Sequence, residues 1–203
     1  MSTKTELHLY LVRHGETDWN VRGILQGTAD IPLNETGRAQ ALELAEEIKA
    51  RGLVFDRIYC SPLSRAKDTA MLATGVTPED LIIDPRLTEI EFAAMEGSPY
   101  ELRDPEALAR LPENLQRFAK DPGGFVPVEG GESIRDVIHR LSSFLQDLEQ
   151  TVSPGEKVLI VSHGCALHGF LFGLCDKTDL MDFWKPLLGN CRLAEWKEGE
   201  LIV

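Results

Sequence analysis

A histidine between an arginine and a glycine directly follows the first apolar run of the chain. The run spans residues 7–12, and Arg13, His14 and Gly15 come immediately after it. An imidazole can attack phosphorus while a guanidinium holds the phosphoryl oxygens, and glycine lets the backbone turn sharply and approach closely. A histidine at a strand end is also often a hydrogen-bonded structural residue. The tripeptide alone leaves both roles open.

Two further apolar runs end in residues of the same chemical type. Residues 57–60 form a short predicted strand that leads to Arg65, and the continuous run 157–161 leads to His163. A continuous β-branched run is typical of a strand buried on both faces. Ligands of open α/β sheets bind outside the carboxyl ends of the strands. If these strands are neighbours, two histidines and two arginines converge on one cleft.

Strand and helix patterns alternate along the whole chain. Predicted helices begin near Asn34 or Thr36, near Arg65 and at Ser133, with Asp136 completing a capping box, and a last helix includes residues 167–174. Gly52 and Gly75 are predicted to end the first two, and a late strand is expected over 191–196. The alternation predicts an α/β fold in three layers, a mainly parallel sheet with helices on both faces.

Residues 98–128 interrupt this alternation. They contain five prolines and a Gly123–Gly124 pair, with a short helix predicted over residues 106–118. Such a segment is either an ordinary surface loop or a lid over the cleft. We favour an irregular cap insertion over the carboxyl ends of the strands, because long insertions in compact domains are often lids.

Size and charge limit the possible functions. The 203 residues are expected to form one domain, residues 1–203. The net charge of -12 argues against nucleic acid and anionic membranes as partners. Residues 1–6 lack the apolar core of a signal peptide and no segment approaches the length of a membrane span, so we expect a cytoplasmic protein. Any electropositive pocket for a phosphate ester must be local.

No metal or other cofactor is expected. His163 and His168 are five positions apart, which does not place both on one helical face, and the chain has no Cys/His cluster. The cysteines are widely spaced and are expected to be reduced: Cys60, Cys165, Cys175 and Cys191. Cys165 follows His163 by two residues, so a redox-active thiol is an alternative there.

The ordered motifs resemble the histidine phosphatase superfamily, the phosphoglycerate-mutase-like branch 1, over nearly the whole chain. The matching motifs are Arg13–Thr17 with Trp19–Asn20, Leu25–Gly27, Asp30–Asn34 with Gly37, Ser61–Ala66 with Thr69–Ala70, Leu87–Glu89, Glu96–Gly97, Gly130–Ser133 and Val161–Gly164. Ala93 stands where the family usually has glycine, and Met95 where many members have tryptophan. The pocket wall therefore departs from the family pattern, so a family substrate cannot be transferred directly.

The resemblance implies a phosphatase that works through a phosphohistidine intermediate and a cap over the cleft. His14 would be the nucleophile. Arg13 and Arg65 would hold the phosphoryl oxygens with two-point hydrogen bonds. His163 would donate a further hydrogen bond to the phosphoryl group, either as a protonated ring or through a suitably placed N–H.

Family positions also indicate a proton-transfer carboxyl and additional phosphate contacts. Glu89 occupies the position of the general acid and base. Glu91 lies on the same side of an extended segment, so spacing alone does not choose between them. Asn20 resembles a side-chain contact to phosphate and is equally well explained as a turn cap. Gln26 and Gly27 are further phosphate-binding candidates.

Three functions remain open. The first is a phosphomonoesterase acting on a small phosphorylated metabolite. The second is a cofactor-dependent phosphoglycerate mutase, but family mutases generally have a more basic cap, whereas residues 98–129 hold four basic against six acidic side chains. The third is an inactive phosphate-binding module, because fold alone does not fix function. The sequence does not indicate which phosphomonoester is the substrate, and it does not indicate the oligomeric state.

Overall fold

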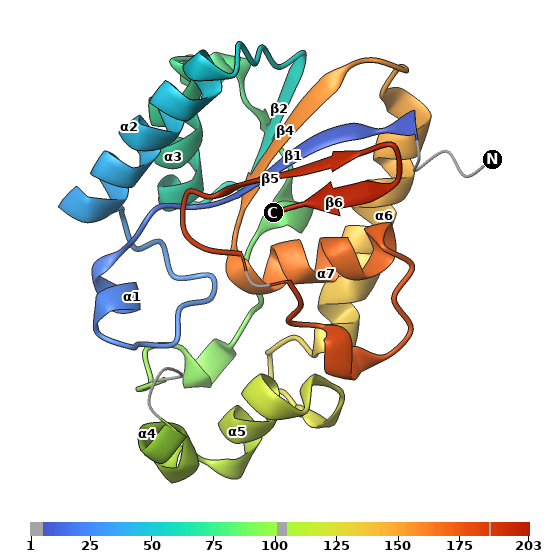
Figure 1. Ribbon diagram of the computed structural model, residues 1–203. Helices are drawn as coiled ribbons and strands as arrows, with labels where there is room; N and C mark the ends of the chain where they lie inside the picture. Colours follow the sequence, from blue (N-terminus) through green and yellow to red (C-terminus); the bar gives the residue numbers. More distant parts are fainter. Residues whose placement is uncertain (1–5, 101–104, 187) are drawn as a thin grey trace.

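The computed structural model describes residues 6–100, 105–186 and 188–203, and its centre is a six-stranded sheet (Figure 1). The strands are β1 (His8–Arg13), β2 (Arg57–Cys60), β3 (Ile82–Ile83), β4 (Lys157–Ser162), β5 (Leu193–Lys197) and β6 (Glu200–Ile202). Their order is β3-β2-β4-β1-β5-β6. The first four pair in parallel, whereas β5 is antiparallel to β1 and β6. The predicted α/β class with a mainly parallel sheet is confirmed.

The two central strands, β1 and β4, end level with each other. Arg13 lies opposite Ser162 in the parallel register, and the apolar residues of both strands are buried. Such strands have neighbours on both edges and helices on both faces, which explains their continuous apolar runs. The N–H of His14 donates to the Ser162 carbonyl at 2.9 Å. His14 and His163, the first residues beyond the strands, therefore start side by side.

Helices cover both faces of the sheet. The helices are α1 (Asp18–Val21), α2 (Glu35–Ala50), α3 (Ser64–Thr74), α4 (Pro105–Arg110), α5 (Glu113–Lys120), α6 (Ile134–Thr151) and α7 (Gly164–Leu174). Tyr10 and Val12 of β1 pack in the core with α2 and α3, and the alternating Leu9 and Leu11 pack with α6 and α7 (Figure 1). Within the described ranges, no helix combines the length and apolarity needed to cross a membrane.

The predicted helix ends are confirmed by their capping contacts. The side chain of Asn34 accepts from the N–H of Gly37 at the start of α2. Ser133 and Asp136 cap α6 reciprocally. Gly75 ends α3 with φ of 75°, a left-handed conformation that favours glycine.

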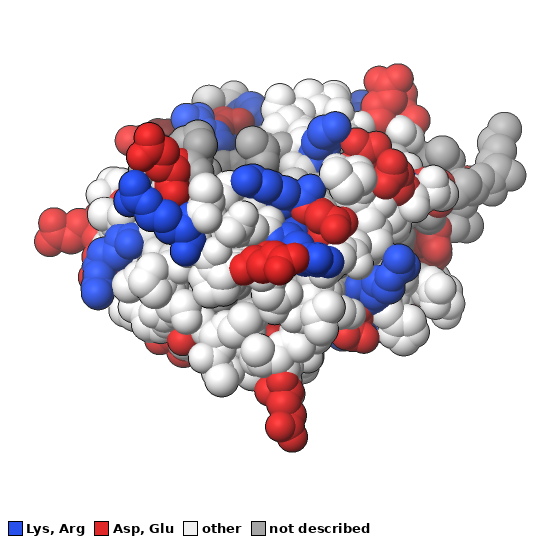
Figure 2. Space-filling view, turned by 90° about the horizontal axis from the view of Figure 1, so that it is seen from below, with Lys and Arg blue, Asp and Glu red and all other residues white. Residues whose placement is uncertain are grey.

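The irregular segment holds two helices where one was expected over residues 106–118. Pro112 separates them, because its missing N–H cannot continue α4 and its ring disfavours helical geometry at the residue before it. Residues 101–104 of the expected cap lie outside the described residues. In Figure 1, α4 and α5 lie below the sheet. Figure 2 views the molecule from that side and shows basic and acidic side chains intermixed.

Short 3-10 helices complete the chain between the larger elements. They span Pro78–Asp80, Pro85–Leu87, Ala93–Met95, Pro122–Gly124 and Leu180–Asp182.

The loop that carries His14 rests directly on the first turn of α2. A β-carbon on Gly37 would overlap the carbonyl oxygen of Glu16, and a β-carbon on Gly15 would lie 2.5 Å from the carbonyl oxygen of Gly37. Both obstacles are backbone atoms, which cannot rotate away. Glycine at these two positions therefore sets how closely the His14 loop approaches α2.

We expect Gly37→Ala to lower the free energy of unfolding by about 1–3 kcal/mol, the usual cost of overpacking. Urea unfolding measures this change. The control is Thr36→Ala, because Thr36 is the exposed neighbour of Gly37. Equal unfolding midpoints for the two variants would contradict the close approach.

Candidate active site

Three strand ends bring the predicted reactive residues together. His14 follows β1 and His163 follows β4, and their ring centres lie 5.1 Å apart. Arg65 lies in the first turn of α3, after β2, and its Nε donates to Nδ1 of His163 at 3.2 Å. All three side chains are buried. The sequence patterns predicted this convergence.

The hydrogen bonds of His14 fix its tautomer. Its Nδ1 lies 2.7 Å from the carbonyl oxygen of Gly15, which can only accept, so Nδ1 carries the proton and Nε2 keeps a lone pair. Burial lowers the pKa of His14 well below its usual 6.5, and the charges of Arg65 and Arg13 lower it further. The amide of Asn190 donates to the His14 carbonyl at 2.6 Å. His14 is thus a neutral imidazole suited to nucleophilic attack.

Arg65 is a fully buried cation, and protein acceptors take up most of its N–H groups. Nη1 donates to the Ala29 carbonyl and Nη2 to the Gly27 carbonyl, each at 2.7 Å. Gln26 fits best with its amide oxygen 2.7 Å from Nε and 3.1 Å from Nη1, since a guanidinium only donates. Burial lowers the pKa of Arg65 to about 10, which leaves it charged at neutral pH. A two-point grip on phosphate by Arg65 stays a prediction that requires exchange of one of these bonds.

The carboxylate of Glu96 holds the loop of residues 27–29, whose carbonyl oxygens accept from Arg65. Oε1 of Glu96 accepts from the N–H of Gly27 at 2.8 Å and from the N–H of Ala29 at 2.6 Å. The carbonyls of the same two residues accept from Arg65. Glu96 therefore positions Arg65 through the loop without bonding to it. Because both backbone groups of Gly27 are engaged, they do not reach phosphate in this arrangement.

His163 is also a neutral ring. Its Nδ1 accepts from Arg65, so Nε2 carries the proton and lies 2.7 Å from Oγ of Ser61. Burial lowers the pKa of His163 well below 6.5, and nearby Arg65 adds to the effect. Of the two forms expected for this donor, the geometry favours the neutral ring with one N–H.

Glu89 and Glu91 point in different directions, because the segment between them is not a regular strand. Glu89 accepts the N–H groups of Cys165 at 3.1 Å and Ala166 at 3.0 Å, at the start of α7, where backbone dipoles stabilise an anion. Glu91 instead accepts from the N–H of Ala93 at 2.7 Å. Of the two carboxylates, Glu89 lines the cavity together with Arg13 and Glu91 does not, and a role of Glu89 in proton transfer stays a prediction.

A cavity of about 490 Å³ adjoins this group, and Arg13, Gln26 and Glu89 belong to its lining. Its polar lining consists of Arg13, Asn20, Gln26, Glu89, Lys120, His168 and Asn190, and the rest of the lining is mainly aromatic and aliphatic. The side-chain oxygen of Asn20 accepts from the N–H of Thr17 at 3.1 Å, so Asn20 caps α1 and also borders the cavity. Both interpretations of Asn20 fit its position.

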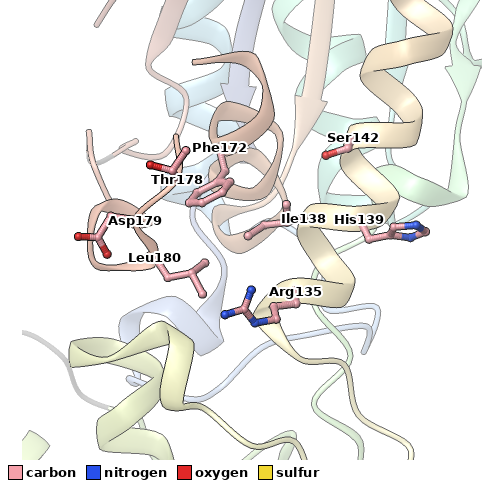
Figure 3. A pocket seen from close by; sticks show the side chains of 8 residues that line it. All are labelled: Arg135, Ile138, His139, Ser142, Phe172, Thr178, Asp179 and Leu180. Carbon is pink, nitrogen blue, oxygen red and sulfur yellow. The ribbon is translucent and has the colours of Figure 1, made fainter. Parts of the chain in front are cut away.

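A second hollow, of about 560 Å³, lies between α6 and the segment after α7 (Figure 3). Figure 3 shows His139 pointing away from Phe172 and Leu180, and His139 is exposed, as its place off the apolar stripe predicted. Functional pockets are recognised by convergent polar groups more than by volume. The cavity beside His14 meets that criterion, and the hollow in Figure 3 does not.

Cys165 borders the cavity as a buried, free thiol. Burial raises its pKa well above the usual value, and the charge of Glu89 raises it further. The thiolate is the reactive form of cysteine, so this environment keeps Cys165 unreactive. The alternative of a redox-active thiol gains no support here.

The site and the fold are those of a known enzyme family. Residues 9–200 match the model of the histidine phosphatase superfamily (branch 1). The chain belongs to this superfamily. Its relatives and structural neighbours include phosphatases of the superfamily, and the chain is a histidine-phosphatase-type enzyme.

Several histidine phosphatase relatives cover most of the chain. The probable phosphoglycerate mutase GpmB of Photorhabdus laumondii is 35% identical over 93% of this chain and 83% of its own length. Phosphoserine phosphatase 1 of Hydrogenobacter thermophilus is 34% identical over 87% and 79%. The crystal structure of phosphoserine phosphatase from Entamoeba histolytica in complex with 3-phosphoglyceric acid has a TM-score of 0.76 at 31% identity, covering 93% of this chain and 89% of that chain.

Three residues of this histidine phosphatase site were not among the predicted site residues. Glu96 holds the loop of Gly27 and Ala29. Ser61 contacts His163, and Asn190 holds the backbone of His14. Asn190 comes just before β5, which is antiparallel to β1, so the start of β5 lies beside the end of β1. A search for polar residues before an antiparallel neighbour strand would have found Asn190.

We expect long-range ¹H–¹⁵N spectra to show His14 as the Nδ1–H tautomer, still neutral at pH 6.5. A lowered pKa means that proton uptake occurs only at more acidic pH, whereas an unperturbed imidazole is half protonated at 6.5. A histidine model peptide recorded under the same conditions serves as the reference. An Nε2–H tautomer, or a charged ring at pH 6.5, would refute the arrangement.

We expect Glu96→Ala to weaken inhibition by inorganic phosphate about tenfold, which corresponds to about 1.4 kcal/mol. The loop of residues 27–29 would lose its acceptor and release Arg65. Glu96→Gln keeps an acceptor oxygen, so most of the affinity should return. The inhibition constant for phosphate measures the effect, and an unchanged constant in Glu96→Ala would exclude the positioning role.

Proposed function

We propose that the protein is a metal-independent phosphomonoester hydrolase that acts on a small phosphorylated metabolite through a phosphohistidine intermediate. The observation that carries the proposal is the neutral His14 ring with its Nε2 lone pair, near the charges of Arg65 and Arg13 and 5.1 Å from the ring of His163. A buried neutral nucleophile beside two guanidinium groups suits attack on a phosphate dianion. We also infer that residues 98–128 form the cap of this single domain, because α5 supplies part of the cavity wall.

In the first step, Nε2 of His14 forms a bond to phosphorus as the bond to the ester oxygen breaks. Glu89, an anion in the free enzyme, takes up one proton when the substrate dianion binds, and its carboxyl gives that proton to the departing alkoxide. Arg13 and Arg65 stabilise the charge on the phosphoryl oxygens, and the N–H of His163 joins them when it exchanges its contact with Ser61 for one with the phosphoryl group. The products of this step are the free alcohol, the phosphohistidine and the Glu89 carboxylate.

In the second step, water replaces the histidine on phosphorus. The Glu89 carboxylate takes a proton from the water as its oxygen bonds to phosphorus, and the bond to Nε2 breaks. Phosphate leaves, His14 regains its lone pair, and Glu89 is again protonated. The residues that stabilise the first transition state also serve the second, since the charge on phosphorus develops in the same place.

A phosphoglycerate mutase is the second candidate, because relatives with that probable activity cover most of the chain. Such an enzyme retains a bisphosphate and must bind a second anionic group away from the nucleophile. Beyond Arg13, the described lining of the cavity contains Lys120 as its other Lys or Arg side chain. This sparse positive charge favours hydrolysis.

We expect His14→Ala to abolish turnover of phosphomonoesters while the protein stays folded. Glu89→Gln should slow turnover by about 10²–10⁴, the usual contribution of general acid–base catalysis, and should allow a phosphoenzyme to form slowly. Phosphate release and ³¹P detection of phosphohistidine measure both effects, with EDTA present throughout.

The control variant is His139→Ala, which removes an exposed histidine far from the cavity and should retain full activity. Normal turnover by His14→Ala would contradict the assignment of His14 as the nucleophile. Interconversion of phosphoglycerates that requires a bisphosphate primer would favour the mutase.

A further inference from the structure

We propose that the alcohol released from the substrate is uncharged and largely apolar, about the size of an arylalkyl group. This inference rests on the proposed hydrolase function and deepens it, because it concerns the part of the cavity beyond the phosphoryl group. It sets the substrate apart from phosphoserine and phosphoglycerates, whose alcohols carry charged groups.

The cavity lining combines two chemically different sets of side chains. Asn190 bonds the His14 backbone and Glu89 accepts from the start of α7, so these two connect the lining to the predicted reactive residues. Six further lining side chains are large and mainly apolar: Trp19, Phe92, Tyr100, Leu108, Phe118 and Trp184. With the phosphoryl group beside Arg13 and Glu89, the alcohol would face this apolar set.

Two polar side chains of the wall are engaged within the protein. Nε1 of Trp184 donates to the Phe118 carbonyl at 2.9 Å. Both ring nitrogens of His168 lie within hydrogen-bond distance of backbone carbonyls. The hydroxyl of Tyr100 is buried and has no hydrogen-bond partner among the described residues. Trp184 and His168 thus offer few hydrogen bonds to a sugar or glycerol hydroxyl, and Tyr100 adds one hydroxyl to an otherwise aromatic surface.

The wall is also rigid. Phe118 is 4% exposed, and its ring centre lies 5.1 Å from those of Phe92 and Trp184 and 5.8 Å from that of Tyr100. These edge and tilted contacts are favourable aromatic geometries. A preformed apolar surface gains affinity from an apolar group without the cost of ordering new side chains.

Beyond Arg13, Lys120 is the Lys or Arg side chain in the described lining that could instead select an anionic alcohol. Its side chain is exposed, and an exposed ammonium contributes little to binding a carboxylate because water screens the pair. Removal of a phenyl-sized apolar surface from water contributes more. The apolar wall therefore outweighs Lys120 in choosing the substrate.

The test compares phosphate esters of primary alcohols, because these alcohols are similarly good leaving groups. We expect kcat/KM for 2-phenylethyl phosphate to exceed that for ethyl phosphate by about tenfold or more, in proportion to the apolar area buried. Phosphoserine and 3-phosphoglycerate should be no better than ethyl phosphate. Equal kcat/KM values across the series, or a preference for the carboxylated esters that Lys120→Gln removes, would overturn the inference.

A matched pair of variants tests the wall itself. Val21 borders the cavity and is 64% exposed, and Val54 is 76% exposed outside it, so both should tolerate replacement. Val21→Asn should lower the ratio of 2-phenylethyl to ethyl phosphate kcat/KM about threefold, and Val54→Asn should leave the ratio unchanged. An unchanged ratio in Val21→Asn, together with equal kcat/KM values for the two esters in the unmodified protein, would contradict the apolar subsite.

Calorimetry with two phosphonates separates this inference from the proposed function. Tighter binding of 2-phenylethylphosphonate than ethylphosphonate supports the apolar subsite and needs no turnover. If that preference is found but no ester is hydrolysed, the hydrolase proposal fails and the subsite stands. If all esters are hydrolysed and the two phosphonates bind equally, the hydrolase stands and the subsite fails.

Discussion

The buried guanidinium of Arg65 is the charge on which the rest of the site depends. A cation without solvent must be surrounded by acceptors, and here these are the carbonyls of residues 27 and 29, the Gln26 amide oxygen and Nδ1 of His163. Each acceptor is fixed in turn, the loop by Glu96 and the ring by Ser61. The same charge helps to keep both catalytic-site histidines neutral. One buried charge thus sets the positions and the protonation of its neighbours.

Much of this arrangement could be predicted from the sequence. The run 157–161 is apolar at every position after its first residue because β4 is buried on both faces, as is usual for the central strands of a parallel sheet. Parallel strands that end level must bring the residues after them together, so His14 and His163 follow from topology. Helix ends with strong local signals, such as Asn34 and Ser133, also matched their predicted places, because capping depends on a few adjacent residues.

Other features depend on contacts between distant segments and leave no local signal. Period-two spacing predicted Glu89 and Glu91 on the same side of an extended segment. The backbone between them is irregular, and they point in different directions because Glu89 accepts from α7 and Glu91 accepts from Ala93. Pro112 divides a helix that composition alone would join. Asn190 acts on His14 only because β5 returns beside β1. In each case the missing information was three-dimensional.

The acidic character of the protein gives the apolar wall of the cavity a further role. A net charge of -12 does not attract a phosphate dianion, so binding must come from short-range contacts to Arg13, Arg65 and nearby N–H groups. Such contacts strengthen where water is displaced, because the effective dielectric constant falls. The aromatic side chains beside Phe118 line the same cavity as Arg13 and Glu89, so an apolar alcohol that covers them would displace water near the phosphoryl group. The wall that would receive the alcohol would therefore also strengthen the electrostatic hold on its phosphate.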